Sequence, residues 1–217
     1  MIRLSSIRSL LLLVTTPLLL ISTLSHAATF SFSTNPFSGS DALTTPGRQV
    51  VGGEGNIPFA TSTDVFEFNA AVFGVSSLSF ANDVIGNVPT TGVNVVVLRT
   101  FDNDANPATP FGAGNAASFL ADRITTAGPG FFIYFNSGLD LARLVYSTNL
   151  SESDADLKIL GRLDNVTGAA GQTVLANFSG ANFRLASAVP EAGSNLVLLL
   201  AAGALAAAHR FFKQRRA

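Results

Sequence analysis

The central part of the chain alternates short apolar runs with clusters of glycine, proline, asparagine, aspartate and serine. Such runs, bounded by turn residues, are typical of strands. In Asp64–Asn69 aromatic and acidic residues largely alternate, which predicts a strand with one face in water, whereas Phe131–Phe135 is apolar throughout and predicts a central strand covered on both faces. The pattern predicts strands at Thr29–Ser33, Gln49–Val51, Asp64–Asn69, Ser77–Phe80, Val93–Thr100, Phe131–Asn136, Leu141–Ser147, Leu157–Leu163 and Asn182–Ala186.

Turn and capping residues connect these strands. Ser137-Gly138 predicts a hairpin between the strands on either side of it. Asn115 is predicted to cap a short helix that runs to Ile124, and a second helical pattern covers Gln172–Asn177. Regular short strands with turn signals predict a mainly β fold, a single β-sandwich or jelly roll with one or two short helices.

A leucine-rich run lies at the start of the chain, before the predicted strands. Arg3 and Arg8 precede the stretch from Leu10 to Leu24, and Ser25-His26-Ala27 places small residues at the −3 and −1 positions of a cut before Ala28. These parts predict a signal peptide at residues 1–27, used by the Sec export machinery and cleaved by signal peptidase between Ala27 and Ala28. An uncleaved N-terminal anchor is the alternative.

A second apolar run lies near the end of the chain. Thirteen residues without a polar side chain, Leu196–Ala208, precede a basic tail. Counted from Ala192 to Phe212, the segment reaches the ~20 residues that a transmembrane helix needs. The positive-inside rule places the tail in the cytoplasm and residues 28–188 outside, as an exported domain. A buried helix of a soluble domain and a plain single-span anchor are the alternatives. The tail cations are Arg210, Lys213, Arg215 and Arg216.

Val189-Pro190-Glu191, the apolar helix and the basic end follow one another within residues 189–217. Together they resemble the PEP-CTERM sorting domain of Gram-negative bacteria that make exopolysaccharide, with Ala192 in place of the second proline. The resemblance implies that an exosortase-type membrane protease recognises and removes the tag. It also implies transient anchoring in the inner membrane, a final place at the cell surface or in the extracellular matrix, and exopolysaccharide as a partner.

The composition of Ala28–Ala188 excludes many chemistries. This segment has no cysteine, methionine or tryptophan, and both histidines, His26 and His209, lie outside it. Ser-His-Asp and Cys-His nucleophiles, His/Cys zinc sites and disulfides are therefore excluded, and a chain without cysteine has no thiol for lipid anchoring. Seven cations against thirteen acids give the segment a net charge of −6, which argues against nucleic-acid binding.

One acidic loop has the ligand spacing of a calcium site. Asp102, Asp104 and Asn106 place side-chain oxygens at positions 1, 3 and 5, as at the start of an EF-hand loop. The rest of that motif is absent, because Pro107 occupies position 6 and Ala113 occupies position 12. The alternative is a polar turn after the preceding strand.

Two further segments have simpler interpretations beside the functional ones. Ser151–Asp156 could supply metal ligands or a carboxylate pair for glycoside hydrolysis, or be a solvated acidic loop. Gly52-Gly53-Glu54-Gly55 lacks the spacing and the following lysine of a phosphate-binding loop, and predicts a flexible loop.

Taken together, the sequence predicts a non-enzymatic exported protein of the cell envelope or extracellular matrix with a structural or adhesive role. It implies no cofactor, and calcium at the acidic loop is the one candidate. The alternatives are a carbohydrate- or calcium-binding module, and a secreted glycosidase that uses two carboxylates.

Overall fold

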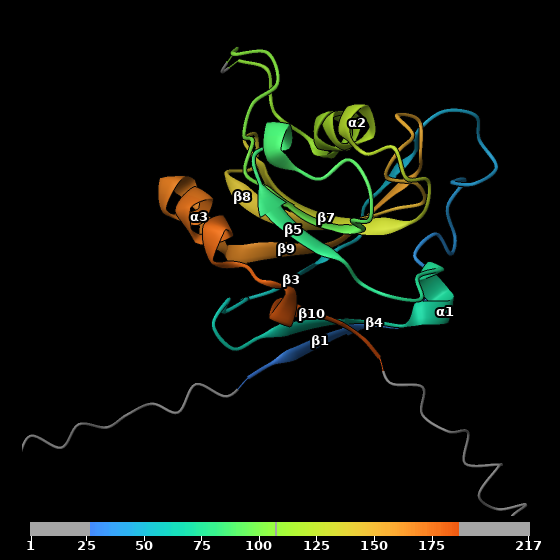
Figure 1. Ribbon diagram of the computed structural model, residues 1–217, viewed down its shortest axis with the longest axis horizontal. Coiled ribbons are helices and arrows are strands. Elements are labelled where there is room, and N and C mark those ends of the chain that lie inside the picture. The colour runs from blue at the N-terminus through green and yellow to red at the C-terminus, as the bar shows by residue number, and fades with distance from the viewer. Residues whose placement is uncertain (1–26, 107, 187–217) are drawn as a thin grey trace, which may run out of the picture.

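The computed structural model describes residues 27–106 and 108–186, so the predicted signal peptide up to His26 and the predicted tag at 189–217 lie outside the described residues. This part of the chain forms three layers, a small sheet, a large sheet and a helix (Figure 1). The small sheet has the order β1 (Thr29–Phe32), β4 (Val65–Phe68) and β10 (Phe183–Leu185). The large sheet has the order β2 (Val50–Val51), β9 (Leu157–Thr167), β8 (Leu141–Ser147), β7 (Gly130–Asn136), β6 (Val95–Leu98) and β5 (Phe80–Asp83), with β3 (Gly55–Asn56) also pairing with β9.

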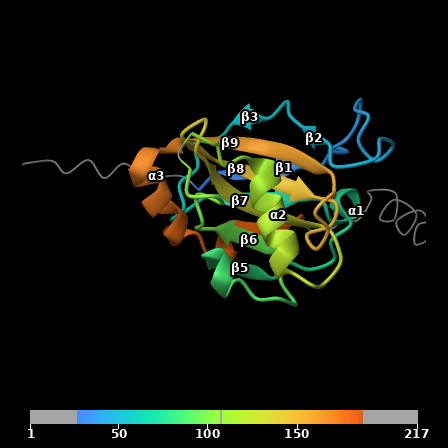
Figure 2. The same cartoon turned by 90° about the horizontal axis from the view of Figure 1, so that it is seen from above.

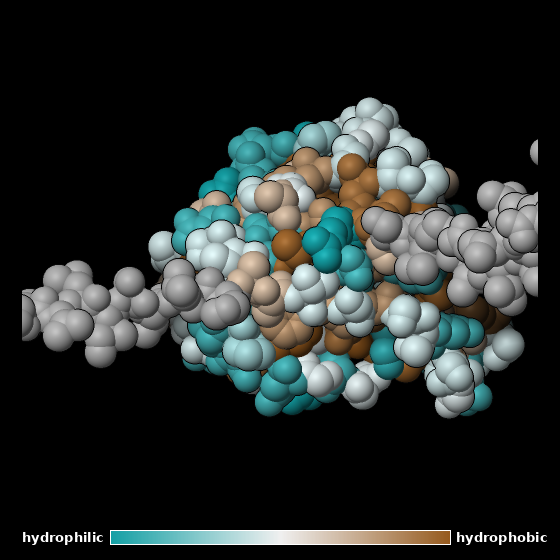
Figure 3. Space-filling model, turned by 90° about the horizontal axis from the view of Figure 1, so that it is seen from below, coloured by the Kyte–Doolittle hydropathy of each residue, from teal (hydrophilic) through white to brown (hydrophobic). Residues whose placement is uncertain are grey.

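Alternation in the small sheet sends aromatic side chains inward and polar ones outward, as predicted for Asp64–Asn69. Phe30, Phe66 and Phe183 are in register across its three strands and pack toward the large sheet. One residue further along, Ser31, Glu67 and Arg184 form the matching outer row. Glu67 accepts hydrogen bonds from Ser31 Oγ at 3.0 Å and from Arg184 Nε at 2.7 Å. Figure 3, the view from below, shows hydrophilic and hydrophobic areas side by side on this face.

Strand β7 lies at the centre of the molecule. Every residue of Gly130–Asn136 is buried, which confirms the prediction of a strand covered on both faces. Phe131 faces the small sheet, where its ring stacks on Phe68 with centroids 3.8 Å apart. Phe132 and Tyr134 face the opposite way, into the core beneath the helix layer. The hairpin predicted at Ser137-Gly138 is also confirmed, because β7 and β8 pair antiparallel.

Helix α2 (Ala113–Arg123) covers the upper face of the large sheet (Figures 1 and 2). Its buried residues recur with the spacing of one helical face, which explains why this stretch forms an amphipathic helix. They are Ala113, Ala116, Ala117 and Leu120. The helix begins earlier than predicted. Asn115 is not the N-cap: its Oδ1 accepts the N–H of the true N-cap, Gly112, at 3.0 Å.

The predicted β-sandwich or jelly roll is wrong, because the described strands pair mostly in parallel and a helix covers one face of the large sheet. Of the pairings in residues 27–106 and 108–186, six are parallel and two, β7 with β8 and β8 with β9, are antiparallel. Neighbouring parallel strands need a crossover connection, which α2 supplies between β6 and β7. The result is a mixed α/β fold.

The remaining elements are short. They are α1 (Ala70–Phe73), α3 (Gly168–Val174) and the 3₁₀ turns η1 (Ile85–Asn87), η2 (Leu175–Asn177) and η3 (Gly180–Asn182). The second predicted helix, Gln172–Asn177, overlaps the end of α3 and all of η2. Strand β5 starts at Phe80, where the predicted strand ended. In residues 27–106 and 108–186, no helix combines the length and apolarity that a membrane crossing needs.

Candidate functional site

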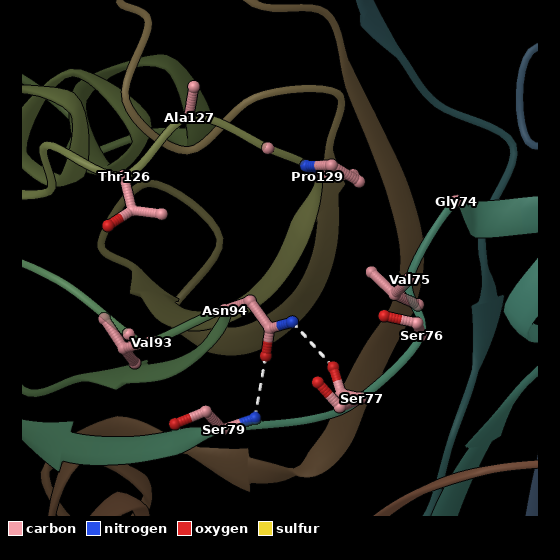
Figure 4. A pocket seen from close by; sticks show the side chains of 12 residues that line it. Gly74, Val75, Ser76, Ser77, Ser79, Val93, Asn94, Thr126, Ala127 and Pro129 are labelled. Carbon is pink, nitrogen blue, oxygen red and sulfur yellow. Dashed lines mark hydrogen bonds between the residues drawn. The ribbon is translucent and has the colours of Figure 1, made fainter.

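A hollow of about 270 Å³ opens at the amino ends of the parallel strands β5, β6 and β7 (Figure 4). Three connecting segments line it, and each leads into one of these strands. One starts at Gly74, which ends α1 in the left-handed conformation with φ of 66°. The segments contribute Gly74–Ser77 with Ser79, Gly92–Asn94, and Thr126–Pro129.

Asn94 holds two of these segments together. Its Oδ1 accepts the N–H of Ser79 at 2.8 Å, and its Nδ2 donates to the carbonyl of Ser77 at 2.8 Å, as Figure 4 shows. The hydroxyl groups of Ser76, Ser77 and Thr126 lie at exposed positions on the rim. The side-chain amide therefore fixes the walls, and the hydroxyl groups face solvent.

The chemistry of this hollow is neutral. Its lining has hydroxyl, amide and backbone groups together with Val75, Val93 and Pro129, and none of the residues that line it is charged. Such a surface can exchange hydrogen bonds with a neutral, hydroxyl-rich ligand and has no counter-charge for an ion. Open α/β sheets usually bind ligands at the carboxyl ends of their strands, so this hollow lies at the opposite end from that rule.

The predicted calcium residues lie in the exposed loop after β6. Each side chain accepts a backbone N–H two residues further on: Asp102 Oδ1 from Asp104 at 3.1 Å, Asp104 Oδ1 from Asn106 at 2.9 Å, and Asn106 Oδ1 from Ala108 at 3.1 Å. These hydrogen bonds are those of a polar turn, and a cation would share or displace them. Within residues 27–106 and 108–186, no group of three or more His, Cys, Asp and Glu side chains is placed to hold a metal ion.

The acidic segment Ser151–Asp156 is divided by the fold. Glu152 and Asp154 are exposed, whereas Asp156 is buried at the start of β9. Its two oxygens accept the N–H groups of Gln49 at 2.7 Å and Leu43 at 2.6 Å. Asp156 thus fastens the long segment between β1 and β2 to the large sheet. The sequence cluster is therefore not one acidic site.

Glu54, assigned to a flexible loop from sequence, is the centre of a partly buried ion cluster. Its side chain is 3% exposed and pairs with Arg143 of β8 and with Arg162 of β9, whose Nε lies 2.8 Å from Oε1. The two arginines are direct neighbours in the β8–β9 register. Burial raises the pKa of Glu54, but the hydrogen bonds from Arg162 and Arg143 outweigh it and hold that pKa at about 2. Local sequence could not indicate this cluster, because its members come from three distant segments.

The described carboxyl groups whose pKa departs from its ordinary value all shift in one direction. Those that depart from their ordinary values are lowered in every case, because hydrogen-bond donors outweigh the effect of burial. They belong to Glu54, Asp64, Glu67, Asp83 and Asp102. A glycosidase general acid needs a raised pKa, and none of these five carboxyl groups has one.

The remaining sequence-predicted residues concern processing. Ala27 and Ala28, on either side of the predicted signal cleavage, are the first two described residues and lead directly into β1. The sorting motif Val189-Pro190-Glu191 and the basic residues Arg210, Lys213, Arg215 and Arg216 lie outside the described residues. No family model matches this chain, and comparison with curated proteins and with solved structures also gives no match.

Proposed function

We propose that this chain is an exported protein of the cell envelope or extracellular matrix with a structural or adhesive role, sorted through its PEP-CTERM-like tag. The observation that carries the proposal is the position of the first and last strands. Strand β1 begins at Thr29, the second residue after the predicted cut, and β10 ends at Leu185, a few residues before Val189. Both strands pair with β4, so the fold occupies the segment between the two predicted tags.

The sorting step is tested by the intact mass of the mature protein from a host that carries an exosortase. We expect a chain that begins at Ala28 and lacks the basic tail. The matched control combines Pro190→Ala with Glu191→Ala, which should leave the tail in place while export continues. A wild-type chain that still ends at Ala217 in the exosortase host contradicts tag removal.

The neutral hollow supports a second candidate function, binding of a neutral glycan. Hydroxyl-rich ligands suit its serine, threonine and backbone groups, and the acidic domain around it disfavours anionic ones. Ala127 lies in the lining, so Ala127→Tyr should fill the hollow and abolish glycan retention on an array. Ala170→Tyr, at an exposed position of α3, is the matched control and should bind like wild type. Equal binding by both variants excludes the hollow as the site.

Calcium binding by Asp102, Asp104 and Asn106 is the other candidate. A bound ion stabilises the folded state by mass action, so added calcium should raise the melting temperature and a chelator should reverse the effect. Asp102→Asn together with Asp104→Asn should abolish that response. An unchanged wild-type melting temperature removes calcium from the proposal.

A further inference from the structure

Asp64 is a buried carboxylate whose hydrogen-bond donors are neutral groups. Its residue is 4% exposed, and its oxygens accept the N–H of Ala28 at 2.9 Å, the N–H of Ala60 at 2.8 Å and the hydroxyl of Thr63 at 3.0 Å. None of the ion pairs found in residues 27–106 and 108–186 includes it. Buried carboxylates usually have a cationic partner, because burying an unpaired charge is costly.

We propose that Asp64 is the acceptor for the α-ammonium group that signal-peptide removal creates at Ala28. Hydrolysis of the Ala27–Ala28 peptide bond adds one water, leaves a carboxyl group on Ala27 and gives Ala28 a free amine, which takes up a proton at neutral pH. The Ala28 nitrogen already lies 2.9 Å from Asp64 Oδ1. Cleavage there replaces an amide N–H by a cation in the same position, and the buried carboxylate gains its counter-charge. This inference rests on the export step of the proposed function.

The backbone around Ala28 holds the nitrogen in place. The carbonyl of Ala28 accepts the N–H of Val65 at 2.9 Å, the first hydrogen bond between β1 and β4. On the other side, Asn182 Nδ2 donates to the backbone carbonyl of Asp64 at 2.9 Å and to that of Thr61 at 2.8 Å. Donor and acceptor are thus fixed by Ala28, directly before β1, and by Asn182, directly before β10. A chain that begins two residues earlier would carry its ammonium outside this contact.

The ion pair gives a defined pH dependence. The side chains that hydrogen-bond to Asp64 are those of Thr63 and Asn182, and both are neutral. The charged groups of the small sheet, Glu67 and Arg184, pair with each other further along. An α-ammonium has a pKa of about 8 in an unfolded chain, and Asp64 should raise that pKa in the folded one. The stabilisation should then be complete below about pH 8 and be lost as the pH rises through the raised value.

The pair is tested on the exported full chain, purified in detergent, against a variant with two serines inserted between Ala27 and Ala28. The insertion keeps Ser25-His26-Ala27 as the cleavage site and keeps the N–H of Ala28, but moves the ammonium away from Asp64. At pH 7 we expect wild type to melt about 5 °C higher, the size of effect that one charge-assisted hydrogen bond produces in a domain of this size. The difference should vanish near pH 11.

A labelling experiment provides a second readout that does not depend on stability. An amine-reactive reagent at pH 7 should modify the α-amine of wild type at least tenfold more slowly than that of the insertion variant, because the paired ammonium is a poor nucleophile. Asp64→Asn, where it folds, should remove the difference in labelling. Equal melting and equal labelling of two chains whose masses show cleavage after Ala27 overturn the inference and leave export intact. A mature chain that does not begin at Ala28 overturns the inference together with the predicted cleavage site.

Discussion

Glu54 is held as a fixed anion between two arginines of neighbouring strands. Its side chain is 3% exposed, while Arg143 and Arg162 are 13% and 44% exposed, so the cluster extends from the interior to the surface. With its pKa at about 2, Glu54 stays ionised at any physiological pH and does not exchange protons there. Its function is to fasten the short edge strands β2 and β3 to β8 and β9.

Replacing Glu54 by glutamine should therefore destabilise the fold. The change leaves two arginines without a counter-charge, and we expect a loss of roughly 2–4 kcal/mol in the free energy of unfolding. Because the folded-state pKa is depressed from 4.5 to about 2, the contribution of the carboxylate is complete above pH 4.5 and is lost as the pH falls toward 2. Urea unfolding between pH 7 and pH 2 measures both effects.

Glu152→Gln is the matched control, since Glu152 lies exposed in the turn before β9. It should change the free energy of unfolding by less than about 0.5 kcal/mol. A Glu54→Gln variant that unfolds like this control at pH 7 would show that the ion cluster contributes nothing to stability.

At the scale of elements, the hydrophobic pattern of the sequence predicted where most strands lie, but not which strands pair with one another. Val95–Leu98 and Phe131–Phe135 are apolar throughout because both faces of β6 and β7 are covered, a pattern that is common in parallel strands and could have indicated the α2 crossover. The small sheet was beyond local analysis, because β1 and β10 come from opposite ends of the described chain and meet on β4. Local sequence analysis could not predict the hollow either, because its three lining segments come together only when β5, β6 and β7 pair in parallel.

Helix α3 packs on the end of β9 more closely than any side chain would allow. A Cβ at Gly171 would lie 2.4 Å from the backbone carbon and 2.8 Å from the backbone oxygen of Val166. Gly171→Ala would gain about 1 kcal/mol of helix propensity on an open helix. Here the backbone contact cannot give way, and we expect a net loss of about 2 kcal/mol, measured by urea unfolding. Gly86→Ala, which has no atom within 4 Å of the added Cβ, should be nearly neutral. Equal stabilities of the two variants would contradict this packing.

At the scale of the whole molecule, stability depends on how the small sheet closes over the large one. Phe183 of β10 is 6% exposed and joins the two: its ring lies 5.8 Å from Phe66 of β4 and 5.5 Å from Phe80 of β5, measured between centroids. The next residue, Arg184, points outward and pairs with Glu67. Two successive residues of this three-residue strand therefore differ in environment: Phe183 packs in the core between the sheets, and Arg184 lies on the surface.

This difference gives a prediction within a single strand. Phe183→Ala should lower the free energy of unfolding by roughly 3–5 kcal/mol, because it opens a cavity between the sheets. Arg184→Ala should cost no more than about 1 kcal/mol, because its direct ion pair with Glu67 lies at the surface, where water screens the two charges. Both variants keep the backbone pairing of β10 with β4, so unfolding in urea separates the effect of inter-sheet packing from that of strand pairing. If the two substitutions cost the same, the small sheet is held by its strand pairing, and the aromatic core between the sheets is not what joins the first and last strands to the rest of the molecule.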